Sequence, residues 1–241
     1  MKLNRIIRRL FFLISLIGIV CVSKAQFENL KFVNYTSKEG LVNESVIKTV
    51  KDKKGFLWIA TLKGLSRFDG KNFKNYTAIE GNSKSLRTNW VTDLIVDKQG
   101  IIWISTEWGI CWYDEAEDNF NYINPMNSLY ILYKAPMCLD DKGNIWAATE
   151  SGLVIIDAEK KKYSISALKR IADPQAICFY QNKIWIGTRG HGLYLYNPSN
   201  HQYQTIAQTI LPTDTHIMNF FVDGERIWAS TSVGLALINS E

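Results

Sequence analysis

Apolar residues in this chain of 241 residues fall in short runs bounded by Asp- and Gly-containing segments. The run 56–61 is apolar on both sides of an extended chain, with Trp58 and Ala60 on one face and Leu57 and Ile59 on the other. A strand with one face in water alternates apolar and polar residues, whereas a strand covered on both faces does not. The pattern therefore predicts a strand packed between two layers of protein.

The segment 52–65 that contains this run is repeated along the chain. Each copy begins with a turn, has a Trp followed two positions later by a small residue, and continues through Thr to Gly-(Leu/Ile). The spacings between the tryptophans are 45, 43, 39 and 43 residues, and the five copies are centred on Trp58, Trp103, Trp146, Trp185 and Trp228. A period in the forties with a strand-turn-strand motif predicts a β-propeller with one blade per repeat. Because this pattern explains the repeated Asp residues structurally, none of them is a catalytic candidate.

Three further strands complete each predicted blade. Inner strands are expected at 46–50, 91–96, 135–139, 176–180 and 217–222, and a third strand follows each Trp strand, as at 65–68. An outer strand at 72–77 alternates apolar and polar residues, as a strand wetted on one face should, and it recurs near 120–123, 163–165 and 203–206. The expected fold is all-β, with four-stranded antiparallel blades.

The order of the strands leaves two architectures open. Residues 31–36 (Lys-Phe-Val-Asn-Tyr-Thr) match the outer strand 72–77 (Asn-Phe-Lys-Asn-Tyr-Thr), and the sequence stops after the third strand of the fifth repeat. In one arrangement the N-terminal strand completes the last blade and closes a ring of five blades, which removes the unpaired edge. In the other, the five repeats are an arc of a larger propeller.

Residues 1–25 have the features of a secretory signal peptide. A basic start precedes an apolar run, Leu10 to Val22, that is too short to span a membrane, and Ser23-Lys24-Ala25 offers small residues for cleavage. The alternative is that this segment is not cleaved and anchors the protein. We expect the chain to contact a membrane only in that case. The prediction is a periplasmic protein whose propeller domain occupies residues 26–241.

Charge and cysteine content narrow the functional classes. The chain has 28 basic and 23 acidic residues, and five of the basic ones lie in residues 1–25, so the remainder is balanced at 23 of each. The basic excess thus belongs to the targeting segment and gives no support to nucleic-acid binding. Cys111, Cys138 and Cys178 lie in different repeats without metal-ligand spacing, which favours buried free thiols.

The repeat resembles the two-component regulator propeller family. The resemblance rests on Gly55-Phe-Leu-Trp-Ile-Ala-Thr61 with Phe68-Asp69, and on Trp103-Ile-Ser-Thr106 with Tyr113-Asp114. It implies the periplasmic sensor region of a hybrid two-component histidine kinase of the Bacteroidota type, which detects glycan fragments. The sequence contains no kinase or receiver domain, so we expect a sensor fragment, a truncated product or a stand-alone relative.

A ligand site is expected where the loops entering the inner strands meet the loops leaving the Trp strands, because loops on a rigid scaffold carry binding. Aromatic side chains there suit sugar rings, and charged ones suit hydroxyls or an acidic sugar. The alternatives are that Trp90 and Trp108 pack between blades and that Arg189 and His191 are solvated. The candidate ligand-binding residues are Trp90, Glu107, Trp108, Tyr133, Asp173, Arg189, His191 and His216.

Catalysis has little support in the sequence. Three histidines in different repeats, without His-x-x-x-His spacing, argue against a metal site, and we expect no cofactor. A propeller lyase or glycosidase using Asp173 and His216 is one alternative function. A scaffold that binds an envelope protein, or a second copy in a dimer, is the other. We expect a small-molecule or oligosaccharide ligand and no enzymatic activity.

Overall fold

The computed structural model describes residues 31–123, 135–149, 152–167, 170–206, 212 and 214–238. The chain divides into two compact units, Met1–Tyr35 and Thr36–Glu241, and the propeller is the second. The predicted signal peptide at 1–25 lies outside the described residues. A search of the described part of the chain finds no helix with the length and hydrophobicity to cross a membrane.

The second unit is a five-bladed β-propeller, as the repeat predicts. Its antiparallel sheets follow one another along the chain, each with its strands in sequence order. The first two blades are β1 (Val46–Lys51), β2 (Leu57–Thr61), β3 (Gly64–Phe68) and β4 (Phe73–Tyr76), then β5 (Val91–Val96), β6 (Ile102–Thr106), β7 (Gly109–Asp114) and β8 (Asn119–Tyr122). Blade 3 has β9 (Met137–Leu139), β10 (Ile145–Thr149), β11 (Gly152–Asp157) and β12 (Lys162–Ala167). Blades 4 and 5 have β13 (Pro174–Tyr180), β14 (Lys183–Thr188), β15 (Leu193–Asn197) and β16 (Gln202–Ile206), then β17 (Ile217–Asp223), β18 (Arg226–Thr231) and β19 (Gly234–Ile238).

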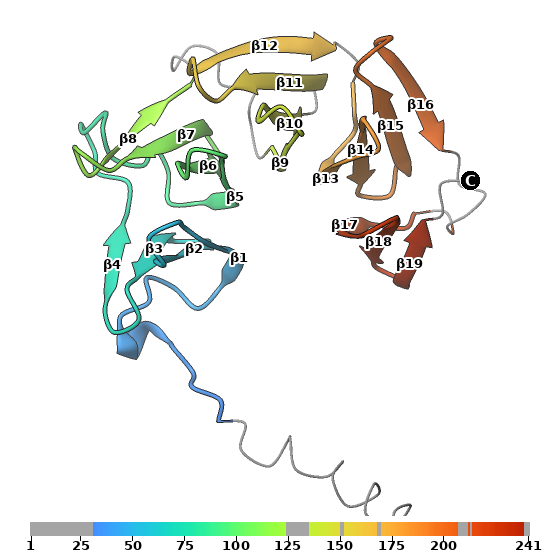
Figure 1. Cartoon of the computed structure of the whole chain (residues 1–241). Helices are drawn as coiled ribbons and strands as arrows, with labels where there is room; N and C mark the ends of the chain where they lie inside the picture. Colours follow the sequence, from blue (N-terminus) through green and yellow to red (C-terminus); the bar gives the residue numbers. More distant parts are fainter. Residues whose placement is uncertain are drawn as a thin grey trace, which may run out of the picture. The chain divides into compact units, whose positions relative to one another are not determined.

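The first strand of each blade faces a common centre. Figure 1 shows β1, β5, β9, β13 and β17 on the inside and β4, β8, β12 and β16 on the outside. Hairpin turns join successive strands, so the β1–β2 and β3–β4 turns lie at one end of a blade. The β2–β3 turn and the segment entering β1 lie at the other end, and the same holds for the other blades. The predicted order of inner, Trp, third and outer strands is confirmed.

The repeated Asp ties each long turn to its Trp. In the first three blades an Asp carboxylate accepts backbone N–H bonds within the turn, two at Asp52 and Asp140 and one at Asp97. Its Oδ2 also accepts the indole N–H six residues later. These indole bonds join Trp58 to Asp52 at 2.8 Å, Trp103 to Asp97 at 2.8 Å and Trp146 to Asp140 at 2.9 Å. Blade 4 has a shorter turn without this Asp, and Trp185 Nε1 is buried without a hydrogen-bond partner among the described atoms. The repeated Asp is therefore a structural residue.

The repeated Thr and Gly close the second turn in all five blades. The Thr hydroxyl at the end of each Trp strand donates to the carbonyl of the Gly that follows the turn. These pairs are Thr61–Gly64, Thr106–Gly109, Thr149–Gly152, Thr188–Gly192 and Thr231–Gly234, at 2.6–2.9 Å. Gly64 has φ of 138°, in the region that side chains with a Cβ avoid. The Thr-x-x-Gly core therefore encodes this turn.

The hydrophobic core lies between blades. In blades 1 to 4 the face of the sheet that carries the Trp, here called the Trp face, packs against the next blade: Trp58 and Leu65 of blade 1 share a buried cluster with Ile104 of blade 2. Trp103, Trp146 and Trp185 enter corresponding clusters with blades 3, 4 and 5. Burial on both faces explains why the Trp strands are apolar throughout.

Small residues two positions after the Trp allow the blades to approach. Ala60, Ser105 and Ala148 are fully buried. A Cβ atom added at Gly187 would lie 2.4 Å from Ile217 Cγ2 of blade 5. Any side chain there would force the two sheets apart, so the predicted crowding is confirmed at this position.

The strand expected at 31–36 is not formed. Residues 31–36 carry no strand assignment, Phe32 is 94% exposed, and the last sheet contains three strands within the described residues. Thr36 instead begins a capping box for the 3-10 helix η1 (Ser37–Glu39), in which its side chain accepts the Lys38 N–H. The alternation in the sequence favours an extended chain, but a strand also needs an edge to pair with, and the pattern does not specify one.

Residues 36–45 cover the first blade. Leu41 is buried, Val42 N–H donates to Ser66 Oγ at 3.0 Å, and Asn75 Nδ2 donates to the Gly40 carbonyl at 2.9 Å. Ser66 and Asn75 belong to β3 and β4. The β3 and β4 part of the face of blade 1 that has no preceding blade is therefore covered by its own chain.

Candidate functional site

The inner strands start with an irregularity that shapes the centre of the propeller. In four of them the pairing register with the Trp strand slips by one residue, which leaves an extra residue at Ile47, Thr92, Gln175 and Met218. Such bulges bend a strand and redirect side chains, and they occur often beside functional sites. Here they repeat at the same place in blades 1, 2, 4 and 5.

A central cavity of about 750 Å³ lies at these bulges. We use the name for the space lined by all four bulge residues, by the residues that follow them, Lys48, Asp93, Ala176 and Asn219, and by Trp90, Pro136, Met137, Asp173, Pro174, Ile177 and Arg189. Each blade contributes to the wall. The chemistry is mixed, with Trp90 and two methionines beside charged and amide side chains.

The predicted residues at the cavity mouth occupy equivalent positions in their blades. In blades 1, 2, 4 and 5 the residue before the inner strand accepts, through its carbonyl, the N–H of the residue that follows the repeated Thr. These bonds are Leu62 to Ser45 (3.2 Å), Glu107 to Trp90 (3.0 Å), Arg189 to Asp173 (3.0 Å) and Ser232 to His216 (2.9 Å). The candidates Trp90, Asp173 and His216 therefore occupy equivalent positions, including in the shortened blades 4 and 5.

Three of the eight candidate residues line the central cavity: Trp90, Asp173 and Arg189. His216 adjoins them, since it pairs with Arg189 in an isolated β-bridge. Asp173 has φ of 46°, and its carboxylate accepts a bond of 2.6 Å from Gln175 Nε2. Blade 4 thus brings an acid, an amide and a guanidinium to one side of the cavity.

The other candidates lie beside the cavity or outside the described residues. Trp108 is 46% exposed and Trp90 37% exposed, so neither indole is buried between blades. His191 is exposed, and its N–H donates to Thr188 Oγ1 at 3.1 Å. Glu107 is joined to Trp90 through its backbone. Tyr133 lies outside the described residues.

A buried carboxylate connects three blades inside the cavity. Asp93 on β5 is 6% exposed, and its Oδ1 accepts a bond from Lys48 Nζ of blade 1 and one of 2.8 Å from Leu94 N–H. Its Oδ2 accepts the Met137 N–H of blade 3 at 2.7 Å. Burial raises the pKa of the Asp93 carboxyl, against the opposing effects of Lys48 and these N–H groups. Asp93 therefore fastens three successive inner strands together.

The sequence did not point to Lys48, Asp93, Gln175 or Asn219 as cavity residues. They follow the predicted mouth residues by two or three positions, inside strands whose pattern is continuous. No Gly stands at the bulge positions, so the sequence does not mark the register slips themselves. Polar residues in an inner strand, such as Asp93 in a Val-Thr-Asp-Leu-Ile-Val run, were the available signal.

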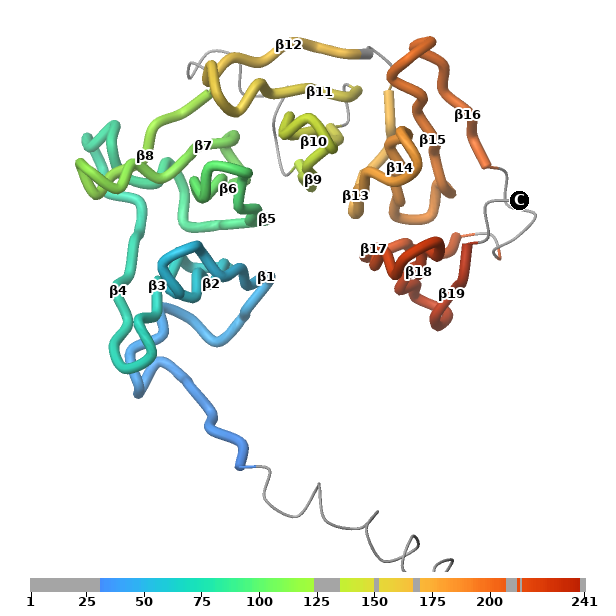
Figure 2. Tube along the Cα trace, in the orientation of Figure 1, coloured from blue at the N-terminus to red at the C-terminus, as the bar shows by residue number. Residues whose placement is uncertain are grey.

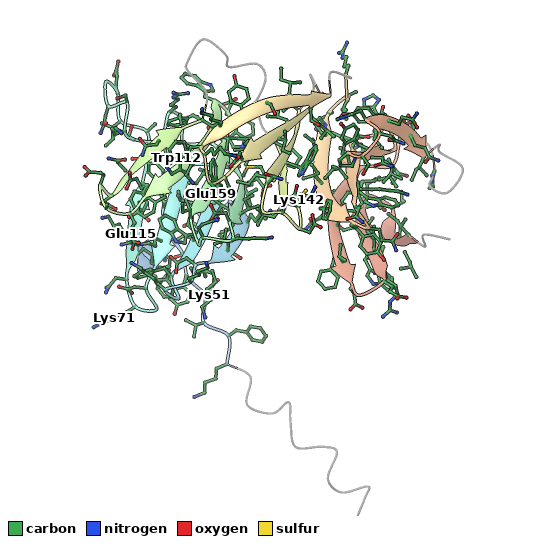
Figure 3. All side chains as sticks on the ribbon, turned by 45° about the horizontal axis from the view of Figure 1, so that its top comes forward. Lys51, Lys71, Trp112, Glu115, Lys142 and Glu159 are labelled. Atoms are coloured by element: carbon green, nitrogen blue, oxygen red, sulfur yellow. The ribbon has the colours of Figure 1, made fainter. Side chains whose placement is uncertain are left out.

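The opposite end of the blades carries charged turns. Figure 3 labels Lys51, Lys71, Glu115, Lys142 and Glu159, which all belong to the turns or strand ends at that end. A second cavity of about 670 Å³ lies there between blades 1 and 2. Two basic side chains in this second cavity have partners within the protein. Lys54 forms an ion pair with Glu115. The Arg67 guanidinium lies 4.6 Å from the centre of the Phe56 ring and donates a hydrogen bond to Tyr113 Oη. Among the described residues no group of three or more His, Cys, Asp or Glu side chains is placed to hold a metal ion.

Comparisons with known proteins agree with the repeat and the fold. Residues 85–108 match the family model described as two component regulator propeller. Histidine kinase P4 of Formosa agariphila is 40% identical over 76 residues, which are 31% of this chain and 6% of that protein.

Solved structures show the same architecture. The extracellular domain of a putative hybrid two component system of B. thetaiotaomicron superposes with a TM-score of 0.72 at 24% identity, over 86% of this chain and 30% of its own. A gluconolactonase of Xanthomonas campestris superposes with a TM-score of 0.57 at 12% identity, over 81% of this chain and 72% of its own. The chain thus spans less than a third of the length of that extracellular domain.

The match at residues 85–108 covers the end of the blade 1 to blade 2 connection and the first half of blade 2. It includes Trp90, which lines the central cavity. It also includes Trp103 and Thr106, which belong to the repeated motif. The resemblance stated from the sequence is confirmed at residues 85–108, which match the two component regulator propeller model.

Proposed function

We propose that this propeller is an extracytoplasmic sensor domain that binds a glycan fragment in the central cavity. The observation that supports the proposal is the lining of the central cavity, which has a volume of about 750 Å³. The five blades share a repeated scaffold, but the side chains that line the cavity differ from blade to blade. They come from the bulges and from the positions at the cavity mouth. Ligand pockets in proteins fall in this range of volumes and combine an apolar lining with a few polar groups.

The lining suits a saccharide. The Trp90 indole, 37% exposed, offers a flat apolar surface for the face of a sugar ring. Gln175, Asn219 and Arg189 supply amide and guanidinium donors from blades 4 and 5. These groups fit hydroxyls, and the guanidinium adds a site for the carboxylate of an acidic sugar.

Binding without turnover fits the state of the carboxylates in the cavity. Both oxygens of Asp93 accept hydrogen bonds from within the protein, and Asp173 accepts one from Gln175. A glycosidase needs two carboxyl groups free to exchange protons or attack across a scissile bond. A lyase or glycosidase function therefore has less support than sensing.

Calorimetric titration of residues 26–241 with a panel of oligosaccharides tests the proposal. We expect saturable binding, weakened roughly tenfold to hundredfold by Trp90→Ala, because one aromatic contact area is lost. Arg189→Ala should weaken binding most for acidic sugars. Trp108→Ala is the matched control, since it removes an indole of similar exposure that does not line the cavity.

Chromatography of the same samples separates sensing from catalysis. The sensing proposal predicts unchanged oligosaccharide after prolonged incubation, whereas a propeller lyase or glycosidase would give shorter products. Equal loss of binding in the Trp90→Ala and Trp108→Ala variants would contradict the central cavity as the site. A panel in which no saccharide binds would contradict glycan sensing.

A further inference from the structure

The connection between the first two blades is a loop that ends at Trp90, one of the residues that line the central cavity. It comprises residues 77–90, and Figure 2 shows it running from β4 past β8, the outer strand of blade 2, to the inner strand β5. Asn89 Oδ1 accepts the Ala78 N–H at 2.6 Å, so a side chain near the end of the loop holds its start. Loops of this length whose ends lie close together pack on their own side chains and often carry function.

The middle of the loop is fixed to blade 2 and to the core. Ser85 is buried, and its Oγ accepts the Ile79 N–H at 3.0 Å. Leu86 is 1% exposed and belongs to the buried cluster between blades 1 and 2. The Lys84 carbonyl accepts the Phe120 N–H of β8 at 2.9 Å. The loop is therefore joined to the propeller along its length.

Contacts on both sides fix the backbone at Trp90. The Arg87 N–H donates to Tyr122 Oη of β8 at 2.6 Å, and the Arg87 guanidinium lies 3.7 Å from the centre of the Tyr122 ring. Thr88 Oγ1 accepts the Trp90 N–H at 3.3 Å, and the Trp90 carbonyl accepts the Glu107 N–H at 3.0 Å. Both backbone polar groups of Trp90 are thus bonded within blade 2.

We propose that the loop 77–90 holds the Trp90 indole in place at the central cavity before a saccharide binds, with Asn89 and Tyr122 as its positioning residues. A side chain that is already immobilised does not lose its freedom on binding, which otherwise lowers affinity. The inference rests on the proposed function, because it assigns to Trp90 the contact with the sugar ring.

Fluorine NMR of the protein labelled with 5-fluorotryptophan observes the indole directly, without any saccharide. The Trp90 signal is the one that disappears in Trp90→Phe. We expect it to shift or broaden in Asn89→Ala, because the bond to Ala78 is lost. Tyr122→Phe is a second variant, since it removes the acceptor of the Arg87 N–H and keeps the aromatic ring.

The matched control is Asn82→Ala. Asn82 is exposed like Asn89 and lies in the same loop, but its Oδ1 accepts the Lys84 N–H at 2.9 Å and holds no residue beside Trp90. The Trp90 signal should therefore stay unchanged in Asn82→Ala. It should also stay unchanged in Asn89→Asp, which keeps an oxygen acceptor for the Ala78 N–H. Thermal unfolding verifies that every variant is folded.

Calorimetric titration measures the consequence for binding, with the member of the oligosaccharide panel that the wild type binds most tightly. Asn89→Ala should weaken binding by about three- to tenfold, whereas Asn82→Ala and Asn89→Asp should bind as the wild type does. A saturating amount of the oligosaccharide should return the Trp90 signal of Asn89→Ala to its position in the saturated wild type. A residue that only stabilises the fold would leave this signal unchanged in folded protein.

The proposal is overturned if the Trp90 signal is the same in Asn89→Ala, Tyr122→Phe and the wild type, or if Asn82→Ala changes it as much as Asn89→Ala does. It is also overturned if Asn89→Ala keeps wild-type affinity for an oligosaccharide whose binding Trp90→Ala weakens. A wild type that binds no saccharide contradicts glycan sensing instead, and the fluorine signal of the free protein still decides whether the loop positions Trp90.

Discussion

The indole Nε1 of Trp103 donates a hydrogen bond of 2.8 Å to Oδ2 of Asp97, and both residues are buried. The other carboxylate oxygen of Asp97 accepts the Ile101 N–H at 2.8 Å. One side chain thus links the turn, the Trp strand and the core between blades 2 and 3. Its repetition in blades 1 and 3 makes this relationship the local basis of the blade.

Asp97→Ala should lower the free energy of unfolding by about 2–4 kcal/mol, because it leaves a buried indole N–H and a backbone N–H unpaired. Denaturant unfolding of the two proteins measures the difference. Asp69→Ala is the control: Asp69 also accepts turn N–H groups, but it is exposed, so its loss should destabilise the protein much less than Asp97→Ala. Equal effects of the two substitutions would refute the structural role assigned to the Asp–Trp bond.

Gly187→Ala should destabilise the protein by about 1–3 kcal/mol through overpacking between blades 4 and 5. The new Cβ would lie 2.4 Å from Ile217 Cγ2. Combining it with Ile217→Ala removes that methyl group, so the cost of Gly187→Ala should be smaller in the Ile217→Ala background. A double-mutant cycle measured by thermal unfolding reports the coupling, and additive effects would mean that the sheets separate freely.

Lys48→Met should cost about 1–2 kcal/mol at neutral pH, a value that allows for the partial exposure of the Lys48 side chain. The loss leaves the buried Asp93 carboxylate without its cation. Burial already raises the pKa of the Asp93 carboxyl in the folded state, so on acidification this carboxyl is protonated at a higher pH than an ordinary Asp. The neutral carboxylic acid no longer interacts with the Lys48 charge. The cost should therefore be present at neutral pH and fade as the pH falls through the Asp93 pKa.

Urea unfolding of wild type and Lys48→Met at several pH values measures this trend. Lys54→Met serves as the control, since the Lys54–Glu115 pair is exposed on both sides and should contribute little at any pH. A Lys48→Met cost that grows on acidification would contradict the assignment.

The cysteines should be unreactive in the folded protein. Cys111 and Cys178 are free, and burial raises the pKa of each thiol to about 12. The reactive thiolate is therefore scarce at neutral pH. Reaction with a thiol reagent should be slow for native protein and complete at three sites per chain of residues 26–241 in denaturant. Fast labelling of native protein would show that the blades open.

The repeat alone predicted most of the fold because its residues act locally. Asp52 and Gly55 form a turn, Trp58 packs in the core between its own blade and the next one, and Thr61 closes the following turn. These roles depend on neighbours within a few positions, so periodicity reveals them. The same locality explains the wrong expectation at 31–36, where the alternation correctly indicated an extended chain but the partner strand could not be inferred.

The candidate site was predicted in part. The expected meeting of the loops before the inner strands with the loops after the Trp strands placed Trp90, Asp173, Arg189 and His216 near one another, because equivalent loops in a propeller lie at one end. The bulges were missed, and with them Asp93 and Asn219, because a register slip arises from how two strands pair. Trp108 shows the converse limit: its position in the motif was predicted correctly, but its side chain does not line the central cavity.

The central claim is that the non-repeated residues at the bulges form the ligand site, and a crystal structure of the domain with a bound oligosaccharide tests it most directly. We predict electron density for the sugar in the central cavity, with one ring against Trp90 and polar contacts to Arg189 and Gln175. Density confined to the opposite end, in the second cavity between blades 1 and 2, would contradict the account.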